Sequence, residues 1–197
     1  MTAKGAATTI EPERSLQRQG RRAAEARATV PDAVYTRDVA VSGELPGDQI
    51  VAAFARALRQ HAGVNAAYRD AQLERYERVN IGLVLPDGDG STAVTIADAD
   101  TKTAADIAAE REELASKVAD GSLTAPETSG ATASATDLSA TGVTAFAPVL
   151  TPPHAAALGI GGRRPDGTVT LTLTCDTRVV SPFTAAAVLD ALAGALA

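Results

Sequence analysis

The sequence is poor in the residues that form disulfides, metal clusters and aromatic surfaces. Its 197 residues include one cysteine, two histidines and no tryptophan, and aromatic residues make up only 3%. A single cysteine excludes an intramolecular disulfide and a cysteine-based zinc cluster. No spacing of His, Asp and Glu supports another kind of metal site. The core must therefore be built from Ala, Val, Leu and Ile, and we expect burial against other subunits to supplement it.

Long apolar runs are also missing. No stretch approaches the roughly 20 apolar residues that span a bilayer, and residues 1–15 have no apolar core of signal-peptide length. We therefore expect a cytoplasmic protein with no membrane partner.

The net charge of −6 is unevenly distributed. Residues 1–28 carry six Lys/Arg against three Asp/Glu, which leaves 12 against 21 in the remainder. A basic arm on an acidic body favours docking onto a neighbouring acidic surface. We expect no nucleic-acid partner, because the arm has no aromatic residues and the body repels a phosphate backbone.

The apolar spacing predicts a single domain over residues 13–197, preceded by a disordered tail of residues 1–12. Helices are predicted over residues 13–28, 48–61, 103–121 and 181–196, with Leu16, Ala23, Ala24 and Ala28 on the buried face of the first. We expect Asp48 to cap the second helix, with Ile50, Phe54 and Leu58 as its buried stripe. The third should begin at Thr103 and stop at Gly121, and Ser181, followed by Pro182, should cap the last. Strands are predicted over residues 34–41, 79–85, 92–96, 143–150, 155–160 and 168–175. The order is not a strict βαβ alternation, so we predict an α+β fold with a mixed sheet and helices packed on one face. By composition alone, residues 121–142 would be a flexible linker.

Five segments, in order, resemble the catalytic core of dihydrolipoamide acyltransferases. They are Leu58 to Tyr68 (LRQHAGVNAAY), Tyr76 to Gly82 (YERVNIG), Ser129 to Thr132 (SGAT), the TPP of 151–153 with the LGIG of 158–161, and Cys175 to Pro182 (CDTRVVSP). The resemblance implies the trimeric fold of chloramphenicol acetyltransferase, with acyl-transfer sites between subunits. It also argues that residues 121–142 are part of the fold.

The departures from this family fall where its chemistry lies. Thr177 stands in the place of the family's general-base histidine, and Ser181 and Pro182 stand in the places of an aspartate and a glycine. Thr136 aligns with the serine that stabilises the oxyanion and keeps a hydroxyl. The alternative is that Thr136 is a strand residue whose hydroxyl bonds to the backbone. The chain also looks trimmed, with a short link before Ile50 where the family usually has another helix.

Two histidines and one cysteine remain as other candidates. His61 lies where the family often has a histidine without catalytic use, so we expect a structural or surface role. His154 follows a double proline and is the better replacement base, although a non-catalytic loop role is the default. Cys175 lacks a basic partner that would lower its pKa, so we interpret it as a packed thiol.

The sequence thus favours a divergent acyltransferase-like protein without the usual catalytic base, acting as an oligomeric scaffold, a regulatory subunit or a binder of acyl thioesters. Its substrate or ligand would be coenzyme A or a carrier-protein thioester. Its partners would be copies of itself, in a homotrimer or larger assembly, or an active paralogue that lends a histidine. The alternatives are an atypical enzyme using the inherited channel and a plain interaction module.

Overall fold

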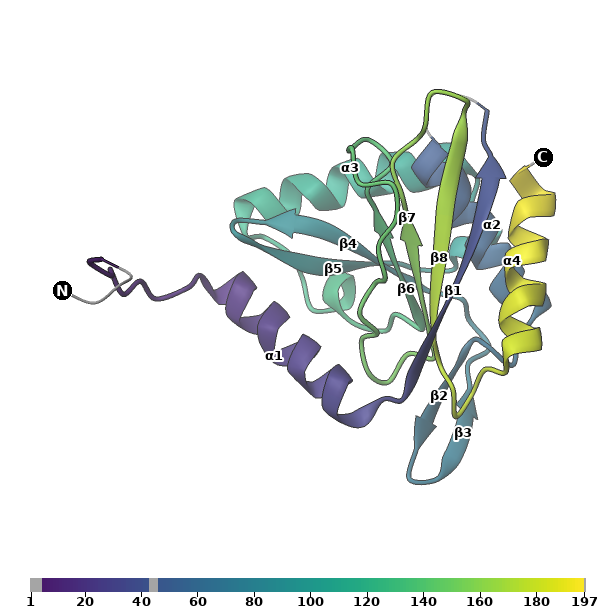
Figure 1. Ribbon diagram of the computed structural model, residues 1–197, viewed down its shortest axis with the longest axis horizontal. Coiled ribbons are helices and arrows are strands. Elements are labelled where there is room, and N and C mark those ends of the chain that lie inside the picture. The colour runs from purple at the N-terminus through teal and green to yellow at the C-terminus, as the bar shows by residue number, and fades with distance from the viewer. Residues whose placement is uncertain (1–4, 43–45, 197) are drawn as a thin grey trace.

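The protein is built around a six-stranded mixed sheet (Figure 1). The computed structural model describes residues 5–42 and 46–196. The strands follow the order β1-β8-β7-β6-β4-β5. They are β1 (Asp32–Ala40), β4 (Ile81–Asp87), β5 (Gly90–Ile96), β6 (Ala133–Asp137), β7 (Ala156–Ile160) and β8 (Thr168–Asp176). β4, β6 and β7 run parallel, and the other neighbours are antiparallel. The predicted mixed sheet and α+β class are confirmed.

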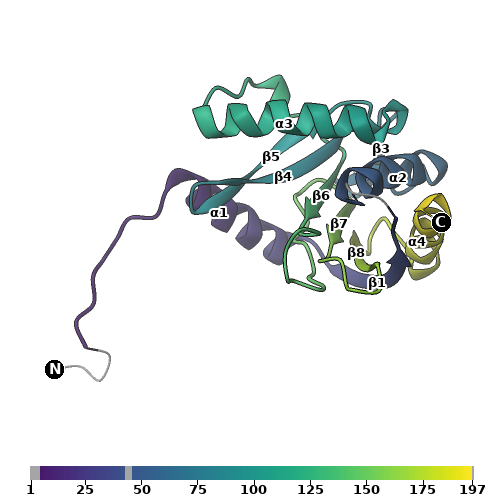
Figure 2. The same cartoon turned by 90° about the horizontal axis from the view of Figure 1, so that it is seen from above.

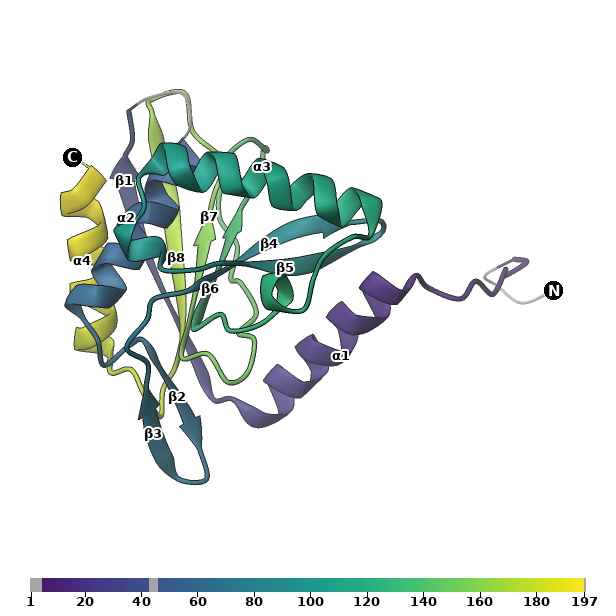
Figure 3. The ribbon, with the colours of Figure 1, turned by 180° about the vertical axis from the view of Figure 1, so that it is seen from behind.

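Three helices cover one face of the sheet, as Figures 2 and 3 show. They are α2 (Pro46–Gln60), α3 (Ala104–Asp120) and α4 (Pro182–Leu196). On α2 the predicted stripe of Ile50, Phe54 and Leu58 is fully buried. Such spacing puts the three side chains on one side of the helix, facing the sheet.

The two ends of α3 are fixed by local chemistry. Thr103 and Asp106 form a capping box at its start. Gly121 ends it with φ +64°, a conformation that favours glycine.

A correction concerns Asp48, predicted to cap α2. Its carboxylate instead accepts hydrogen bonds from Arg111 of α3, at 2.9 and 3.2 Å, and so joins the two helices.

Helix α1 (Arg14–Thr29) lies apart from this layer and packs along the edge strand β5 (Figure 1). The predicted buried face is wrong: Leu16 is 36% exposed, whereas the buried residues are Ser15 and Ala26. Polar contacts hold the helix, including Arg18 on Asp87 at 3.1 Å. The spacing of apolar residues predicted the wrong buried face of α1, because a helix at a sheet edge has only a narrow surface to pack against.

Two other differences from the sequence prediction concern loops and strands. A hairpin of β2 (Ala66–Arg69) and β3 (Gln72–Arg75) was not predicted. Its turn places Asp70 and Ala71 at positive φ, and alanine there is not a turn signal. The strand predicted over residues 143–150 is absent. This segment lies across the sheet, where its backbone comes so close to Gly161 that a Cβ there would be 2.0 Å from the Thr144 oxygen.

Residues 121–142 are an ordered part of the fold, as the family resemblance argued. They contain a short 3₁₀ helix, Pro126–Thr128, and the strand β6. A second 3₁₀ helix, Ala99–Thr101, precedes α3. β6 lies between β4 and β7 in the middle of the sheet, and Ala133 and Ala135 are buried. Small residues suit this position because neighbouring layers approach it closely.

Candidate functional site

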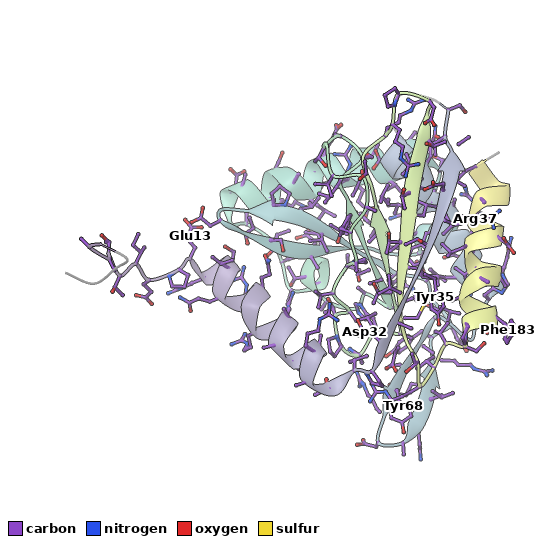
Figure 4. The ribbon with its side chains drawn as sticks, viewed as in Figure 1. Glu13, Asp32, Tyr35, Arg37, Tyr68 and Phe183 are labelled. Carbon is purple, nitrogen blue, oxygen red and sulfur yellow. The ribbon has the colours of Figure 1, made fainter. Side chains whose placement is uncertain are left out.

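The turn that follows β8 is closed by an ion pair. Asp176, whose side chain is 3% exposed, accepts from Arg178 Nε at 2.9 Å and from Arg178 Nη2 at 2.7 Å. The guanidinium also lies over the ring of Tyr68, 4.5 Å from its centroid. Figure 4 labels Tyr68 and Asp32 at this end of the fold. Sequence reasoning missed the pair, although an Asp and an Arg two residues apart were visible in the motif.

Thr177 is exposed and is held by the backbone. Its amide and its hydroxyl both donate to the carbonyl oxygen of Pro31, each at 2.9 Å. The bond connects the end of β8 with the residue before β1. A threonine hydroxyl engaged in this way has no base beside it and cannot remove a proton from a substrate near neutral pH.

Ser181 caps the last helix, as predicted. Its Oγ accepts from the amide of Thr184 at 3.2 Å and lies 2.8 Å from the Thr184 hydroxyl. Pro182 follows as the first helical residue, which is a favourable position for proline. The two residues that replace the family's Asp and Gly therefore serve to start α4.

Thr136 lies on β6 and lines a cavity of about 300 Å³. One wall of this cavity is the apolar segment of residues 146–150. Within the described residues, no hydrogen bond involves the Thr136 hydroxyl. The interpretation of a hydroxyl bonded to the backbone is therefore wrong, and the hydroxyl is available to a ligand.

The sheet register keeps Thr136 and Thr177 apart. Thr136 pairs with Gly159, which pairs with Thr172, and Thr177 follows directly after the end of that strand. With about 3.3 Å per residue and about 4.8 Å between strands, their backbones are about 19 Å apart. A site that uses both side chains must take them from two different chains.

His154 follows the double proline and lies just before the start of β7. Its backbone pairs with Ala67 of β2, and the residue is 8% exposed. Burial lowers the pKa of His154 to about 4, a hydrogen bond from the ring to the backbone of Ala131 opposes this shift, and the charge of Arg22 adds to it. The Nδ1 atom is buried and has no partner among the described residues. The ring is therefore neutral at physiological pH.

The other two candidates fit structural roles. Burial, with a smaller effect of Asp176, raises the pKa of Cys175 to about 12, so the thiol is not nucleophilic. His61 follows the end of α2, half-buried, and its amide donates to the Ala57 carbonyl. Across residues 5–42 and 46–196, no three His, Cys, Asp or Glu side chains are grouped to hold a metal ion.

Comparison with known proteins decides the family. The model of the 2-oxoacid dehydrogenases acyltransferase catalytic domain matches residues 45–197. The chain belongs to this acyltransferase family. A Dictyostelium discoideum acetyltransferase component of the mitochondrial pyruvate dehydrogenase complex is 30% identical over 68% of the chain and 23% of its own length. The chain spans about a quarter to a third of the curated relatives it matches first.

Solved structures give the same result for the fold of this acyltransferase family member. The cubic core of a pyruvate dehydrogenase multienzyme complex has a TM-score of 0.88 at 25% identity, over 99% of this chain and 93% of the other. Azotobacter vinelandii dihydrolipoamide acetyltransferase has a TM-score of 0.89 at 22% identity, over 99% of this chain and 93% of the other. That structure was studied for the roles of a serine, a histidine and an asparagine in the catalytic mechanism. A chloramphenicol acetyltransferase matches with 0.58 at 13% identity, over 91% and 95%. The predicted chloramphenicol acetyltransferase-like fold is confirmed.

The described part of the chain contains no helix that is both long enough and apolar enough to cross a membrane.

Proposed function

We propose that this member of the acyltransferase family has lost its own general base and acts as an oligomeric scaffold, a regulatory subunit or a binder of acyl thioesters. One observation carries the proposal: the Thr177 hydroxyl, at the position aligned with the family's histidine, donates to the Pro31 carbonyl at 2.9 Å. Loss of a positioned base typically lowers the rate about 10²- to 10⁴-fold. The Asp176–Arg178 pair stabilises the turn without any requirement for catalysis.

Oligomerisation is part of the same proposal. Thr136 and Thr177 are about 19 Å apart in one chain by strand geometry, so the inherited site is complete only when a second chain brings its β8 turn to the first chain's Thr136. We propose a homotrimer, for which the similarity to a cubic core is support. An active paralogue in a mixed trimer would bring a histidine to that same position.

A thioester ligand fits the Thr136 cavity. Its apolar wall of residues 146–150 suits an acyl or thioether segment, and the free Thr136 hydroxyl suits a thioester carbonyl oxygen. We propose coenzyme A or a carrier-protein thioester as this ligand.

The test compares acetyl-CoA turnover, with dihydrolipoamide as acceptor, in the wild-type protein and in the double variant Thr177→His, Ser181→Asp. The wild type should bind acetyl-CoA and show no turnover above the uncatalysed rate. The double variant should gain about 10²-fold or more if the channel survives. Thr177→Val is the matched control, because it changes the same side chain without adding a base. Robust turnover by the wild type would overturn the proposal, and native mass measurement decides the oligomeric state.

A second candidate function is an atypical enzyme that uses His154. The observation that favours it is the buried Nδ1 atom without a partner. A ring with a pKa of about 4 is a weak base, so we rank this function second. Acetyl transfer by the wild type that His154→Gln abolishes, and that His61→Gln leaves intact, would establish it in place of the first.

A further inference from the structure

A cavity of about 780 Å³ lies beside α1 and adjoins the Thr136 cavity, with which it shares Arg22, Ala93 and Thr151. Its walls come from the second half of α1, from the hairpin β2–β3 and the residues after it, and from two loops, residues 128–132 and 151–154. Figure 1 shows α1 and the hairpin at the same end of the sheet. Neither Thr136 nor Thr177 lines this cavity.

His154 lines the cavity and has a buried polar atom without a hydrogen-bond partner. It is 8% exposed, and its buried Nδ1 has no partner among the described residues. A buried polar atom without a partner is unfavourable, because it has lost its hydrogen bond to water. The neutral ring donates its one N–H to the backbone of Ala131, so Nδ1 is left as an acceptor. A ligand that donates a hydrogen bond to Nδ1 would satisfy it.

The charges around the cavity favour an anion. Four arginines and two glutamates line it. Arg69 and Arg78 are paired with Glu74 and Asp98. The guanidinium groups of Arg22 and Arg75 form no ion pair or hydrogen bond with any described residue.

Arg22 is the charged group whose effect reaches the His154 ring, where it disfavours protonation. The carboxylates of Glu25 and Glu77, both exposed, have no such effect on the ring. Arg22 is therefore a positive charge near His154, although the protein as a whole is acidic. An anion bound there would be attracted by Arg22, and the exposed Glu25 and Glu77 in the same wall would only weaken that attraction.

Backbone donors complete the site. Gly130 and Ala131 both line the cavity, and their amides make no hydrogen bond within the described residues. Gly130 has φ +79°. Free amides beside guanidinium groups suit a group with several acceptor oxygens better than a carboxylate with two.

We propose that this cavity binds a phosphate-bearing small molecule, with a P–OH of the phosphate donating to His154 Nδ1, an anionic oxygen at Arg22, and the phosphate within reach of the amides of Gly130 and Ala131. The proposal does not depend on the function proposed above. It explains why α1 carries an unpaired arginine over a cavity and why a buried histidine keeps a free ring nitrogen.

The test titrates inorganic phosphate into the full chain and follows the imidazole ¹⁵N resonances. Only two histidines are present, and His61 does not line the cavity, so it serves as an internal reference. Phosphate should shift the His154 resonances and leave those of His61 in place. Arg22→Ala should weaken binding about tenfold or more, the effect expected for loss of a charge-assisted hydrogen bond.

Arg21→Ala is the matched control, because Arg21 is the neighbouring exposed arginine on α1 and does not line the cavity. It should change the affinity less than twofold, roughly, as expected for a screened surface charge. His154→Gln, checked for folding by circular dichroism, should also weaken binding. Equal weakening by Arg21→Ala and Arg22→Ala would show only a general charge effect and would overturn the proposal.

A titration with acetate tests which class of anion binds, and competition with coenzyme A tests which molecule carries the phosphate. Acetate that binds as tightly as phosphate would overturn the assignment to phosphate. Competition by coenzyme A and not by dephospho-coenzyme A would place a thioester carrier's phosphate monoester in the cavity. Competition by neither would leave a free phosphorylated metabolite as the occupant. Unchanged His154 resonances at millimolar phosphate would overturn the proposal whatever the acyltransferase assay shows.

Discussion

Asp176 and Arg178 form a bidentate ion pair at the end of β8, with the carboxylate almost completely buried and the guanidinium over Tyr68. The arginine thus pairs with the carboxylate two residues before it and not with a side chain at position 181. The turn therefore remains fixed while Ser181 is free to cap α4.

The first prediction concerns this pair. Arg178→Met should lower the free energy of unfolding by about 2–3 kcal/mol, because it leaves a buried carboxylate without its partner. Urea denaturation measures the change. Arg27→Met is the control: it breaks the more exposed Arg27–Asp32 pair and should cost about 0–1 kcal/mol. Equal losses in the two variants would show that the Asp176–Arg178 pair has no special structural role.

The second prediction is a pH dependence of stability caused by His154. The pKa of His154 is about 4 in the folded protein, below the value of about 6.5 for an unfolded chain. The unfolded state therefore binds the proton first, so stability is complete above pH 6.5 and decreases as the pH falls toward 4. The expected loss is about 3 kcal/mol.

The pH range over which stability is lost separates the effect of His154 from the effect of the carboxylates. Hydrogen bonds from Lys117 and then from Thr124 lower the pKa of Glu127 to about 2. Its contribution is therefore present above about pH 4.5 and is lost only below that. Denaturation curves between pH 7 and pH 5 should lose their slope in His154→Gln and keep it in His61→Gln. A slope that survives in His154→Gln would assign the pH effect to other groups.

The third prediction concerns Cys175, which is buried and whose pKa is raised to about 12. A thiol reagent such as Ellman's reagent should label the native protein only at the rate of unfolding, because the thiolate is both rare and inaccessible. Thr177→Cys in a Cys175→Ser background should react rapidly, since position 177 is exposed. Fast labelling of the wild type would contradict the packed-thiol interpretation.

The fourth prediction tests how closely the segment over the sheet packs. Gly161→Ala should destabilise the fold by about 1–3 kcal/mol, because the added Cβ would lie 2.0 Å from the Thr144 oxygen. Gly142→Ala is the control, since nothing lies within 4 Å of a Cβ there. Thermal unfolding of the two variants should differ clearly. Similar transition temperatures would show that residues 143–150 move aside without cost.

Much of the fold was predictable because its signals are local. The stripe of Ile50, Phe54 and Leu58, the Thr103 cap and the Gly121 stop all act within one or two turns of a helix. The buried face of α1 was not predictable, because it depends on which strand edge the helix meets. The strand predicted over residues 143–150 failed because β-propensity does not tell whether a partner strand is available.

For the site, the sequence by itself determined which residue types occupy the aligned positions. It placed a threonine, a serine and a proline where the family has its histidine, aspartate and glycine, and it determined the family through motifs in order. Only the tertiary structure decided what those residues do. Thr177 donates to Pro31, Asp176 captures Arg178, and His154 keeps a free nitrogen beside Arg22. Some of these contacts join segments that are distant in the chain, and others depend on burial. The spacing of residues along a sequence does not determine which groups are buried away from water or which groups meet across a sheet.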